Sequence, residues 1–530
     1  MTTRTILAAA LIVLAGAVPH PAIAEVQRIV IAPAVSETAQ ALKSSIKASR
    51  EAKAVGAEQL YYFYGGRGFE PLWISEVAGT WQVSAKLASL SRAFAKAGDL
   101  GLESTDYALP AKTIVSTDDA VAYELAVTSA ALRFGAENYG GRLEPRSLSS
   151  NLDMPRPQLG ADDLLAIFDA DDPGQALFDL APREAEFQAL LTKLREFKEP
   201  APVVQIAGGA SIKPGASDDR VPALRERLGL TAMEDAPGLY DEALVEAVRA
   251  FQTNAGLTAD GIVGNATREA LNSAGQVTRE QLLVNLEKWR WLPRERGNYR
   301  VEVNIPEYRL WVRRDGEAVH ETKVIVGSAE HQTPIFYDQI RHVVVNPYWN
   351  VPTSIVRRSI APQALRNPDF INRGGYELFY NGQAVAPSSI DWASLSPGSF
   401  PFAVRQKPSL SNSLGQVKFL FPNKHDVYLH DTPEKNLFGR DARAYSSGCV
   451  RVENPFDFAA AMLANEPNIN RERLEASFGP RERWFNMEVK VPVYLTYFTL
   501  RVDGDGSLRS FADIYGHDKK IAAALLGSEL

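Results

Sequence analysis

The spacing of apolar residues changes near residue 299, and this change constrains the fold more than any other feature. Upstream, apolar residues recur with the period of a helix, and one set at i, i+3, i+4 and i+7 comprises Phe187, Leu190, Leu191 and Leu194. Downstream, apolar residues alternate, as Tyr299, Val301 and Val303 do. A chain of 530 residues that separates these patterns into blocks is predicted to be an α+β protein of two to four domains.

The helical part of the sequence is predicted to hold two units. Residues 25–205 form an α-helical unit, in which the aromatic stretch at residues 61–73 is interpreted as a packed corner. Pro and Gly clusters predict a linker at residues 206–218. Residues 219–274 contain three short helical patterns separated by glycine turns, which predict a small three-helix domain.

The alternating part, residues 299–515, is predicted to be mostly β-structure. Its short strands and turn signals favour a sandwich or a partly closed barrel. Residues 353–415 interrupt the pattern with Pro, Gly and Ser clusters, and such a segment is either a lid over a site or a peripheral decoration. The acidic turn at residues 503–506 is interpreted as a hairpin rather than a calcium loop, because Ile514 stands where such a loop has glutamate.

The first 24 residues have the pattern of a secretory signal peptide. Arg4 gives a positive start, residues 6–18 form an apolar run of thirteen, and Ala-Ile-Ala at residues 22–24 supplies a small-x-small cleavage site. The mature chain is therefore expected to begin at Glu25. Thirteen apolar residues are few for a bilayer and no later stretch is long enough, so the exported chain is predicted to have no transmembrane segment.

The composition argues against several classes of function. A formal net charge of −7 and the lack of a basic stripe argue against binding of nucleic acid. Cys449 is the only cysteine, so the chain can form neither an intramolecular disulfide nor a thiolate metal site. The seven histidines lack the spacing typical of metal ligands, so neither a metal nor another cofactor is expected.

The context of Cys449 favours a nucleophile over a buried apolar residue, although burial is the usual fate of an isolated cysteine. His430 lies nineteen residues upstream, at the end of a strand-like run, and as an imidazolium it would lower the pKa of the thiol. Gly448 permits close approach, and its amide and that of Cys449 could point at a developing oxyanion. On a strand, Arg451 shares a face with Cys449 and could hold a substrate carboxylate; a structural salt bridge is an equal alternative.

These residues resemble the catalytic signature of the L,D-transpeptidases. His430 and the run S-S-G-C-V-R at residues 446–451 follow the pattern H…[ST]-x-G-C-[VI]-R. Supporting segments lie at residues 324–327, together with the pair Thr333 and Pro334, and at residues 346–352, in the family's order. Residues 251–264 resemble the three-helix peptidoglycan-binding domain of cell-wall enzymes. The whole chain is similar to the large periplasmic members that carry a scaffold domain.

The resemblance implies a reaction and a role for each site residue. Cys449 would attack the carbonyl of the third residue of a peptidoglycan tetrapeptide stem and expel D-alanine, with His430 as general base and then acid. The thioester would pass to the diamino-acid amine of a second stem, which makes a 3→3 cross-link. Orienting roles would fall to Gly448, Ser447 and the main chain of Asp431, and substrate contacts to Arg451, Ser446, Tyr428 and Trp349.

The resemblance also implies a periplasmic, wall-associated protein that acts in cell-wall biogenesis and cell shape, with carbapenems as inhibitors that acylate Cys449. It favours a mobile lid for residues 353–415. Hydrolysis of the same bonds, as by an L,D-carboxypeptidase or endopeptidase, needs the same two residues and stays open, as does a lipoprotein lysine as acceptor. A non-catalytic wall-anchoring protein would have lost Cys449 or His430, and both are present. A papain-like protease has its histidine after the cysteine, the reverse of the order here.

Overall fold

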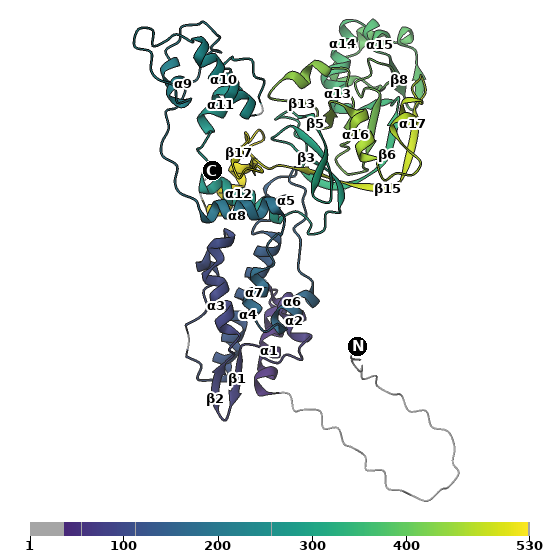
Figure 1. The fold of residues 1–530 in the computed structure, drawn as a ribbon. Helices are drawn as coiled ribbons and strands as arrows, with labels where there is room; N and C mark the ends of the chain where they lie inside the picture. The colour runs from purple at the N-terminus through teal and green to yellow at the C-terminus, as the bar shows by residue number, and fades with distance from the viewer. Residues whose placement is uncertain (1–35, 55, 112, 256, 528–530) are drawn as a thin grey trace, which may run out of the picture.

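A computed structural model describes residues 36–527, apart from residues 55, 112 and 256. The predicted signal peptide and its cleavage site lie outside the described residues. Figure 1 shows a helical stem that carries two lobes, one of three helices and one built on a β-barrel. None of the described helices is long and apolar enough to cross a membrane.

The stem is a helical unit built around one long helix. Its elements are α1 (Glu37–Glu51), α2 (Ala57–Gly65), β1 (Ile74–Val77), β2 (Thr80–Val83), α3 (Leu87–Ala95), α4 (Thr117–Gly140), α5 (Pro145–Leu148), α6 (Ala161–Asp169), α7 (Pro173–Phe178) and α8 (Ala185–Arg195). On α4, the buried carboxylate of Glu124 accepts hydrogen bonds from the Tyr64 hydroxyl and the Trp73 main-chain N–H. Both aromatic side chains are fully buried, which confirms that the aromatic stretch is a packed corner.

The three-helix lobe comprises α9 (Val221–Arg227), α10 (Glu242–Asn254) and α11 (Asn265–Ser273), which pack around a hydrophobic core of their own. The side chain of Asp241 accepts a hydrogen bond from the Leu244 N–H and so caps α10. The lobe touches the barrel through Thr258, whose N–H and hydroxyl donate to the Asp441 carboxylate at 2.8 and 2.9 Å. Asp441 lies in the loop that leads toward Cys449, so the two lobes meet close to the signature residues.

The barrel is built from a nine-stranded sheet in which eight strands close into a ring. Its strands are β3 (Tyr299–Asn304), β4 (Arg309–Arg314), β5 (Glu317–Gly327), β6 (Phe336–Val345), β11 (Val417–Leu420), β12 (Leu429–His430), β13 (Ala444–Ser446), β14 (Val450–Val452) and β15 (Arg483–Thr496). They run in the order β13-β5-β14-β12-β11-β6-β15-β3-β4, and an antiparallel β4–β5 pairing completes the ring. The ninth strand, β13, pairs with the end of β5. The pairs β12–β14, β13–β5 and β15–β3 are parallel. The predicted α+β class is confirmed, and of the two β architectures considered the chain adopts the barrel.

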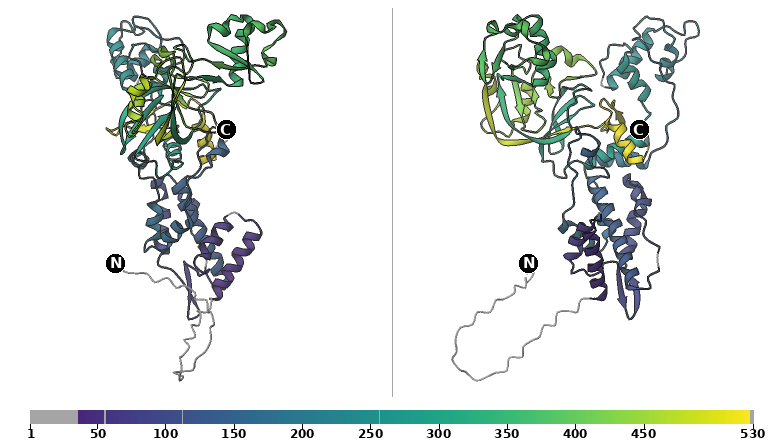
Figure 2. Two further views of the ribbon diagram at one scale, coloured as in Figure 1. Left: turned by 90° about the vertical axis from the view of Figure 1, so that its right-hand side faces the viewer. Right: turned by 180° about the vertical axis from the view of Figure 1, so that it is seen from behind.

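An insertion projects from the barrel as a small subdomain (Figure 2). Its elements are β7 (Trp349–Val351), α13 (Thr353–Ile355), the π-helical turn η3 (Val356–Ile360), α14 (Ala361–Arg366), α15 (Asp369–Arg373), β8 (Tyr376–Tyr380), β9 (Gln383–Val385) and β10 (Ala403–Gln406). A separate sheet in the order β7-β10-β8-β9 and a separate hydrophobic core hold it together. The Pro-, Gly- and Ser-rich segment is thus a folded unit with its own core.

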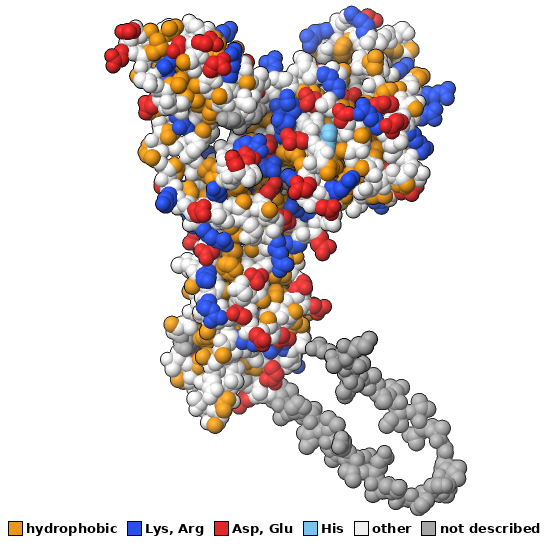
Figure 3. All heavy atoms as spheres, in the orientation of Figure 1, with side chains coloured by type: hydrophobic (Ala, Val, Ile, Leu, Met, Phe, Trp, Pro, Cys, Tyr) orange, Lys and Arg blue, Asp and Glu red, His pale blue; other side chains and the backbone are white. Residues whose placement is uncertain are grey.

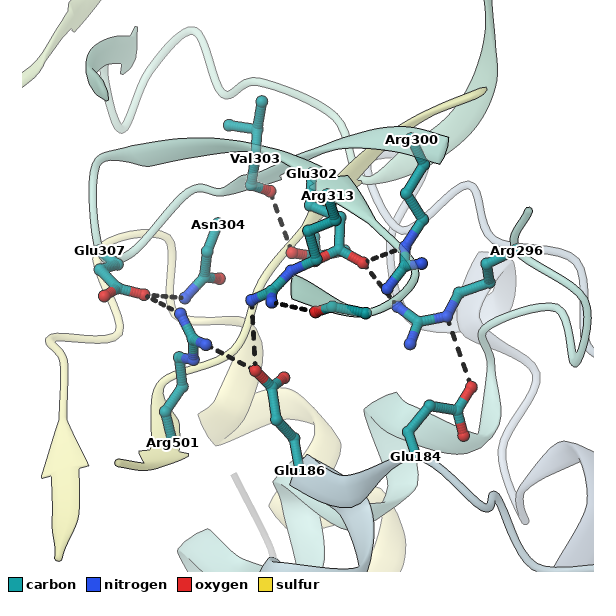
Figure 4. Close-up of polar contacts among 12 residues, drawn as sticks. Glu184, Glu186, Arg296, Arg300, Glu302, Val303, Asn304, Glu307, Arg313 and Arg501 are labelled. Carbon is teal, nitrogen blue, oxygen red and sulfur yellow. Dashed lines mark hydrogen bonds and ion pairs between the residues drawn. The ribbon is translucent and has the colours of Figure 1, made fainter. Parts of the chain in front are cut away.

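The stem and the barrel meet at the buried helix α12 (Arg279–Arg290) and at a network of ion pairs (Figure 4). The network joins two carboxylates of the stem, two arginines and a carboxylate of the barrel, and one arginine each from the connection before β3 and from the segment after β15. These residues are Glu184, Glu186, Arg300, Arg313, Glu302, Arg296 and Arg501. Glu302 on β3 lies 2.6 to 2.9 Å from three of the arginines. Burial alone would raise the pKa of Glu302, but the charges of these arginines lower it to about 2.

The C-terminal segment returns from the barrel to the stem. It follows α16 (Pro455–Met462) and α17 (Arg471–Glu475) and comprises β15, the hairpin β16 (Leu500–Val502) and β17 (Leu508–Ser510), and α18 (His517–Leu526). The acidic turn is the connection of this hairpin, as predicted. On α18, Asp518 pairs with Lys288 of α12 at 2.6 Å, which fixes the segment against the junction.

Candidate active site

Two short parallel strands carry the residues expected to do the chemistry. In the register of β12 and β14, His430 pairs directly with Arg451. Tyr428 and Cys449 precede these residues by two positions, and alternate side chains of a strand share a face, so all four lie on the same side of the sheet. The Tyr428 and His430 rings are 5.6 Å apart between centroids. The residues between them, Leu429 and Val450, are buried in the barrel core, so the four face outward.

A main-chain contact holds His430 in one orientation. The side chain is buried, and Nδ1 lies 2.5 Å from the carbonyl oxygen of Asp431. Because a carbonyl oxygen only accepts, Nδ1 carries the proton of the neutral ring and Nε2 is left as an acceptor. The Asp431 carboxylate is engaged elsewhere, since it accepts hydrogen bonds from the Gln416 N–H and the Lys435 ammonium. Asp431 therefore contacts the histidine through its main chain.

The histidine and the cysteine are both uncharged at neutral pH. Burial, followed by the positive charge of Arg451, lowers the pKa of His430 to about 3. Burial raises the pKa of the Cys449 thiol to about 11. The expectation that an imidazolium would lower the thiol pKa is therefore wrong for this state, because desolvation disfavours the charged form of each group. With these pKa values, a nucleophilic attack by this sulfur would require the proton to leave during the attack.

Aromatic side chains flank the thiol. Cys449 is partly exposed, and its Sγ lies 3.7 Å from the carbonyl oxygen of Asp426. Burial, followed by the neighbouring Cys449 sulfur, raises the pKa of Tyr428. The side chain of Trp349, on β7 of the insertion sheet, interacts with Tyr428. Two of the expected substrate contacts, Tyr428 and Trp349, thus lie together beside the cysteine.

The loop before the cysteine is braced by hydrogen bonds of its own. Gly448 has a φ of +117°, which favours glycine. Its N–H donates to Oγ of Ser446 at 3.1 Å, and that hydroxyl donates to the Cys449 carbonyl oxygen at 2.5 Å. The Gly448 amide, expected to face an oxyanion, is therefore used inside the loop, and the buried Ser446, expected to contact substrate, acts as a brace. Within the described parts of the chain the Cys449 N–H makes no hydrogen bond, so it remains available to an oxyanion.

The two remaining expected contacts already have partners. Arg451 forms an ion pair with Glu434, so a carboxylate of this chain already balances its charge. Ser447 is exposed, and its hydroxyl accepts a hydrogen bond from Nη2 of Arg358 at 3.2 Å. Arg358 belongs to η3, so the insertion reaches a residue only two positions before Cys449.

Two residues outside the signature hold the main chain of Gly448. Thr333 donates its hydroxyl proton to the Gly448 carbonyl oxygen at 2.7 Å and accepts from the Gly327 N–H at 2.9 Å. Tyr515 accepts from the Thr333 N–H at 3.2 Å and donates to the Gly327 carbonyl oxygen at 2.6 Å. Sequence reasoning noted Thr333 only as part of a Thr-Pro segment and missed Tyr515, because that contact depends on the path of the C-terminal segment.

Two of the other histidines have polar partners outside the site. His425 contacts the Asp153 carboxylate at 2.7 Å, and His342 contacts Asn486 at 2.9 Å. In the part of the chain that the structure describes, no three His, Cys, Asp or Glu side chains cluster as metal ligands. The chemical groups that this face offers are a thiol, an oriented imidazole and a main-chain amide.

Three regions of the chain match known families. Residues 298–469 match the L,D-transpeptidase catalytic domain, residues 58–194 match the scaffold domain, and residues 224–271 match a family described as "Putative peptidoglycan binding domain". These regions coincide with the barrel, the stem and the three-helix lobe.

Individual relatives match parts of the chain. A Haemophilus influenzae protein named "Putative L,D-transpeptidase" is 36% identical over 253 residues, which are 47% of this chain and 50% of that protein. The N-acetylmuramoyl-L-alanine amidase CwlL of Bacillus licheniformis is 41% identical over 71 residues, which are 13% of this chain and 20% of that protein. The chain thus spans half or less of the length of either relative.

A solved L,D-transpeptidase structure from Xylanimonas cellulosilytica is 19% identical, with 55% of this chain and 98% of that chain covered and a TM-score of 0.17. At this TM-score, the two chains do not superpose as whole structures. The family matches and the Haemophilus relative agree with each other and with the signature on β12 and β14. One chain thus combines regions that match a scaffold domain, a peptidoglycan-binding domain and the catalytic domain of L,D-transpeptidases.

Proposed function

We propose that this protein is a peptidoglycan L,D-transpeptidase that forms 3→3 cross-links through a thioester on Cys449. One observation carries the proposal: Nδ1 of His430 contacts a main-chain carbonyl oxygen, so Nε2 is the acceptor nitrogen of a ring on the face that bears Cys449. A nucleophile beside a base that a third group orients is the arrangement used in covalent acyl transfer. The family match of residues 298–469 supports the same chemistry.

In the first step, Sγ of Cys449 attacks the carbonyl carbon of the third stem residue while Nε2 of His430 takes the thiol proton. The carbonyl oxygen gains an electron pair and accepts a hydrogen bond from the Cys449 N–H, which has no other partner among the described residues. The bond to the terminal D-alanine then breaks, and His430 gives its proton to the leaving amine. The donor stem stays on the sulfur as a thioester.

In the second step, the side-chain amine of a diamino acid on a neighbouring stem attacks the thioester. His430 takes a proton from this amine, the new amide bond forms, and the carbon–sulfur bond breaks. The sulfur then recovers the proton from the imidazole. Water in place of the amine would give hydrolysis with the same two residues, so the product depends on which nucleophile enters after D-alanine has left.

We assign the rest of the chain to two roles: it holds the protein at the cell wall, and it controls how the donor stem reaches Cys449. The family matches indicate a protein of the cell wall, and the proposal places it in the periplasm after removal of residues 1–24. The three-helix lobe holds it on peptidoglycan, and the insertion acts as a mobile lid over the donor stem. Carbapenems are expected to acylate Cys449.

Product analysis tests the proposal. Residues 25–530 are incubated with disaccharide-tetrapeptides of peptidoglycan, and the products are separated and weighed by mass spectrometry. The expected products are dimers that have lost one D-alanine, formed by the native protein but not by the variants Cys449→Ala or His430→Ala. Tripeptides without dimers would show that the protein hydrolyses the bond and does not transfer the donor stem to an amine. No change in any sample, with the variants folded, would contradict both activities.

A further inference from the structure

The insertion is the basic part of an acidic chain. Residues 353–415 contain six Lys and Arg and three Asp and Glu, a net charge of +3, whereas the whole chain carries −7. Blue Lys and Arg side chains line the upper right edge of Figure 3, over the insertion. A cationic subdomain beside the signature residues favours an anionic occupant.

Three of the six cations of the insertion have a carboxylate partner within it. Arg373 pairs with Asp369 at 2.7 Å, and Arg405 pairs with Glu377 at 2.7 Å. Lys407 lies 3.5 Å from the same Glu377 carboxylate. The exceptions, which have no carboxylate partner within the described part of the chain, are Arg357, Arg358 and Arg366.

Of these three exposed arginines, only Arg358 contacts the loop of the nucleophile, through the 3.2 Å hydrogen bond to Ser447. It sits on the π-helical turn η3, an element that recurs at functional sites. A serine hydroxyl is a neutral partner, and a carboxylate would form a stronger, charge-assisted pair with the same guanidinium. Arg451, the other cation beside Cys449, is already paired with Glu434. Among the described residues, Arg358 is therefore a cation that touches the loop of Cys449 and has no carboxylate partner.

We propose that Arg358 is a specificity residue that binds a free carboxylate of the donor stem when the insertion closes over Cys449. The proposal rests on the proposed transpeptidase function and adds the group that selects the donor. The carboxylate has two sources close to the scissile bond: the terminus of the departing D-alanine and the free carboxyl group of the third residue. On binding, the guanidinium exchanges the Ser447 hydroxyl for this carboxylate.

The test pairs changes in the protein with changes in the donor. Three donors are compared: the tetrapeptide acid, its C-terminal amide, and the peptide with an amidated third residue. The proteins are the native chain, Arg358→Gln, Arg358→Lys and, as matched control, Arg366→Gln, which removes another exposed arginine without a carboxylate partner. Initial rates give kcat/KM, and binding to the same proteins in a Cys449→Ala background gives Kd without turnover.

Arg358→Gln is expected to weaken binding and kcat/KM for the acid donor about tenfold to a hundredfold, the range for a hydrogen bond to a charged group. Amidation of the carboxylate that Arg358 holds should lower kcat/KM of the native protein by a similar factor. The same amidation should not lower kcat/KM of Arg358→Gln any further. The donor that shows this non-additivity identifies the source of the carboxylate. Arg358→Lys should retain part of the affinity, and Arg366→Gln should match the native protein.

Equal kcat/KM and Kd of Arg358→Gln and the native protein for the acid donor would overturn the proposal. The proposal would also be overturned if Arg358→Gln and each amidation lowered kcat/KM by independent factors that multiply when the two changes are combined. Absence of turnover by the native protein, with Kd values that still depend on Arg358 and on the carboxylate, would instead contradict only the transpeptidase function. The two failures are therefore distinguishable.

Discussion

The charge state of Cys449 leads to the sharpest prediction. Burial raises the pKa of the thiol to about 11, so the thiolate forms only as the pH rises toward that value. At pH 7 the thiolate fraction is on the order of 10⁻⁴, against roughly 3% for a free cysteine with a pKa of about 8.5. Because the thiolate is the reactive form, Cys449 should be alkylated roughly 300-fold more slowly than an unstructured cysteine at this pH.

The assay is simple because Cys449 is the only cysteine of the chain. Iodoacetamide, a neutral probe, is added at pH 6 to 10.5, and the modified fraction is followed by intact mass. The rate constant should rise about tenfold per pH unit up to about pH 10, without a plateau near neutrality. The same protein unfolded in urea provides the reference for an unstructured cysteine.

The variant His430→Ala separates two roles of the imidazole. A neutral imidazole does not stabilise a thiolate, so iodoacetamide should react with the variant and the native protein at similar rates. Acylation by a tetrapeptide donor, which needs a base, should be lost in the variant. A plateau with an apparent pKa below 8 that disappears in His430→Ala would refute this reasoning, because it would show a resting thiolate–imidazolium pair.

Three further predictions concern groups around the site. Glu302→Gln should lower the free energy of unfolding by about 3–5 kcal/mol, because it breaks buried ion pairs with three arginines. The folded pKa of Glu302 is lowered to about 2. The stabilisation that the Glu302 carboxylate gives the native protein is therefore complete above about pH 4.5 and is lost as the pH falls toward 2. Tyr515→Phe should cost about 1–3 kcal/mol in urea unfolding and slow the acylation of Cys449, because the Gly327 carbonyl and the Thr333 N–H lose their partner. Asp441→Ala should free the three-helix lobe, which small-angle scattering would register as a larger radius of gyration.

Matched controls exist for each variant. Glu317 and Tyr380 are exposed, so Glu317→Gln and Tyr380→Phe should leave stability and acylation unchanged. Asp315→Ala lies in an exposed turn and should not alter the radius of gyration. The stability difference between the native protein and Glu302→Gln should shrink as the pH falls from 7 to 3, so a difference that stays constant would contradict the first prediction. Native acylation by Tyr515→Phe would contradict the second.

Apolar periodicity was sufficient to predict the fold class. The change from helical to alternating spacing near Tyr299 coincides with the start of β3, and the strands downstream close into one barrel. Period-two spacing also predicted that Arg451 shares a face with Cys449, and the parallel register of β12 and β14 adds His430 to that face. These inferences succeed because both depend on local geometry along the chain.

The details of the site depend on contacts that spacing does not encode. The pKa values of His430 and Cys449 depend on burial, which is a property of the whole barrel. The Gly448 N–H donates its hydrogen bond to the Ser446 side chain of the same loop. Tyr515 reaches the site because β15 carries the chain back across the barrel, and Arg358 reaches it because the insertion folds as a subdomain with its own core.

The central claim is that Cys449 carries the donor stem as a thioester. The direct measurement is rapid-quench intact mass of the native chain mixed with a tetrapeptide donor, followed by mapping of the modified peptide. The account predicts a mass gain equal to the donor minus D-alanine on the peptide that contains Cys449, and no gain in Cys449→Ala. Product formation without this adduct at any quench time, or an adduct that retains D-alanine, would contradict it.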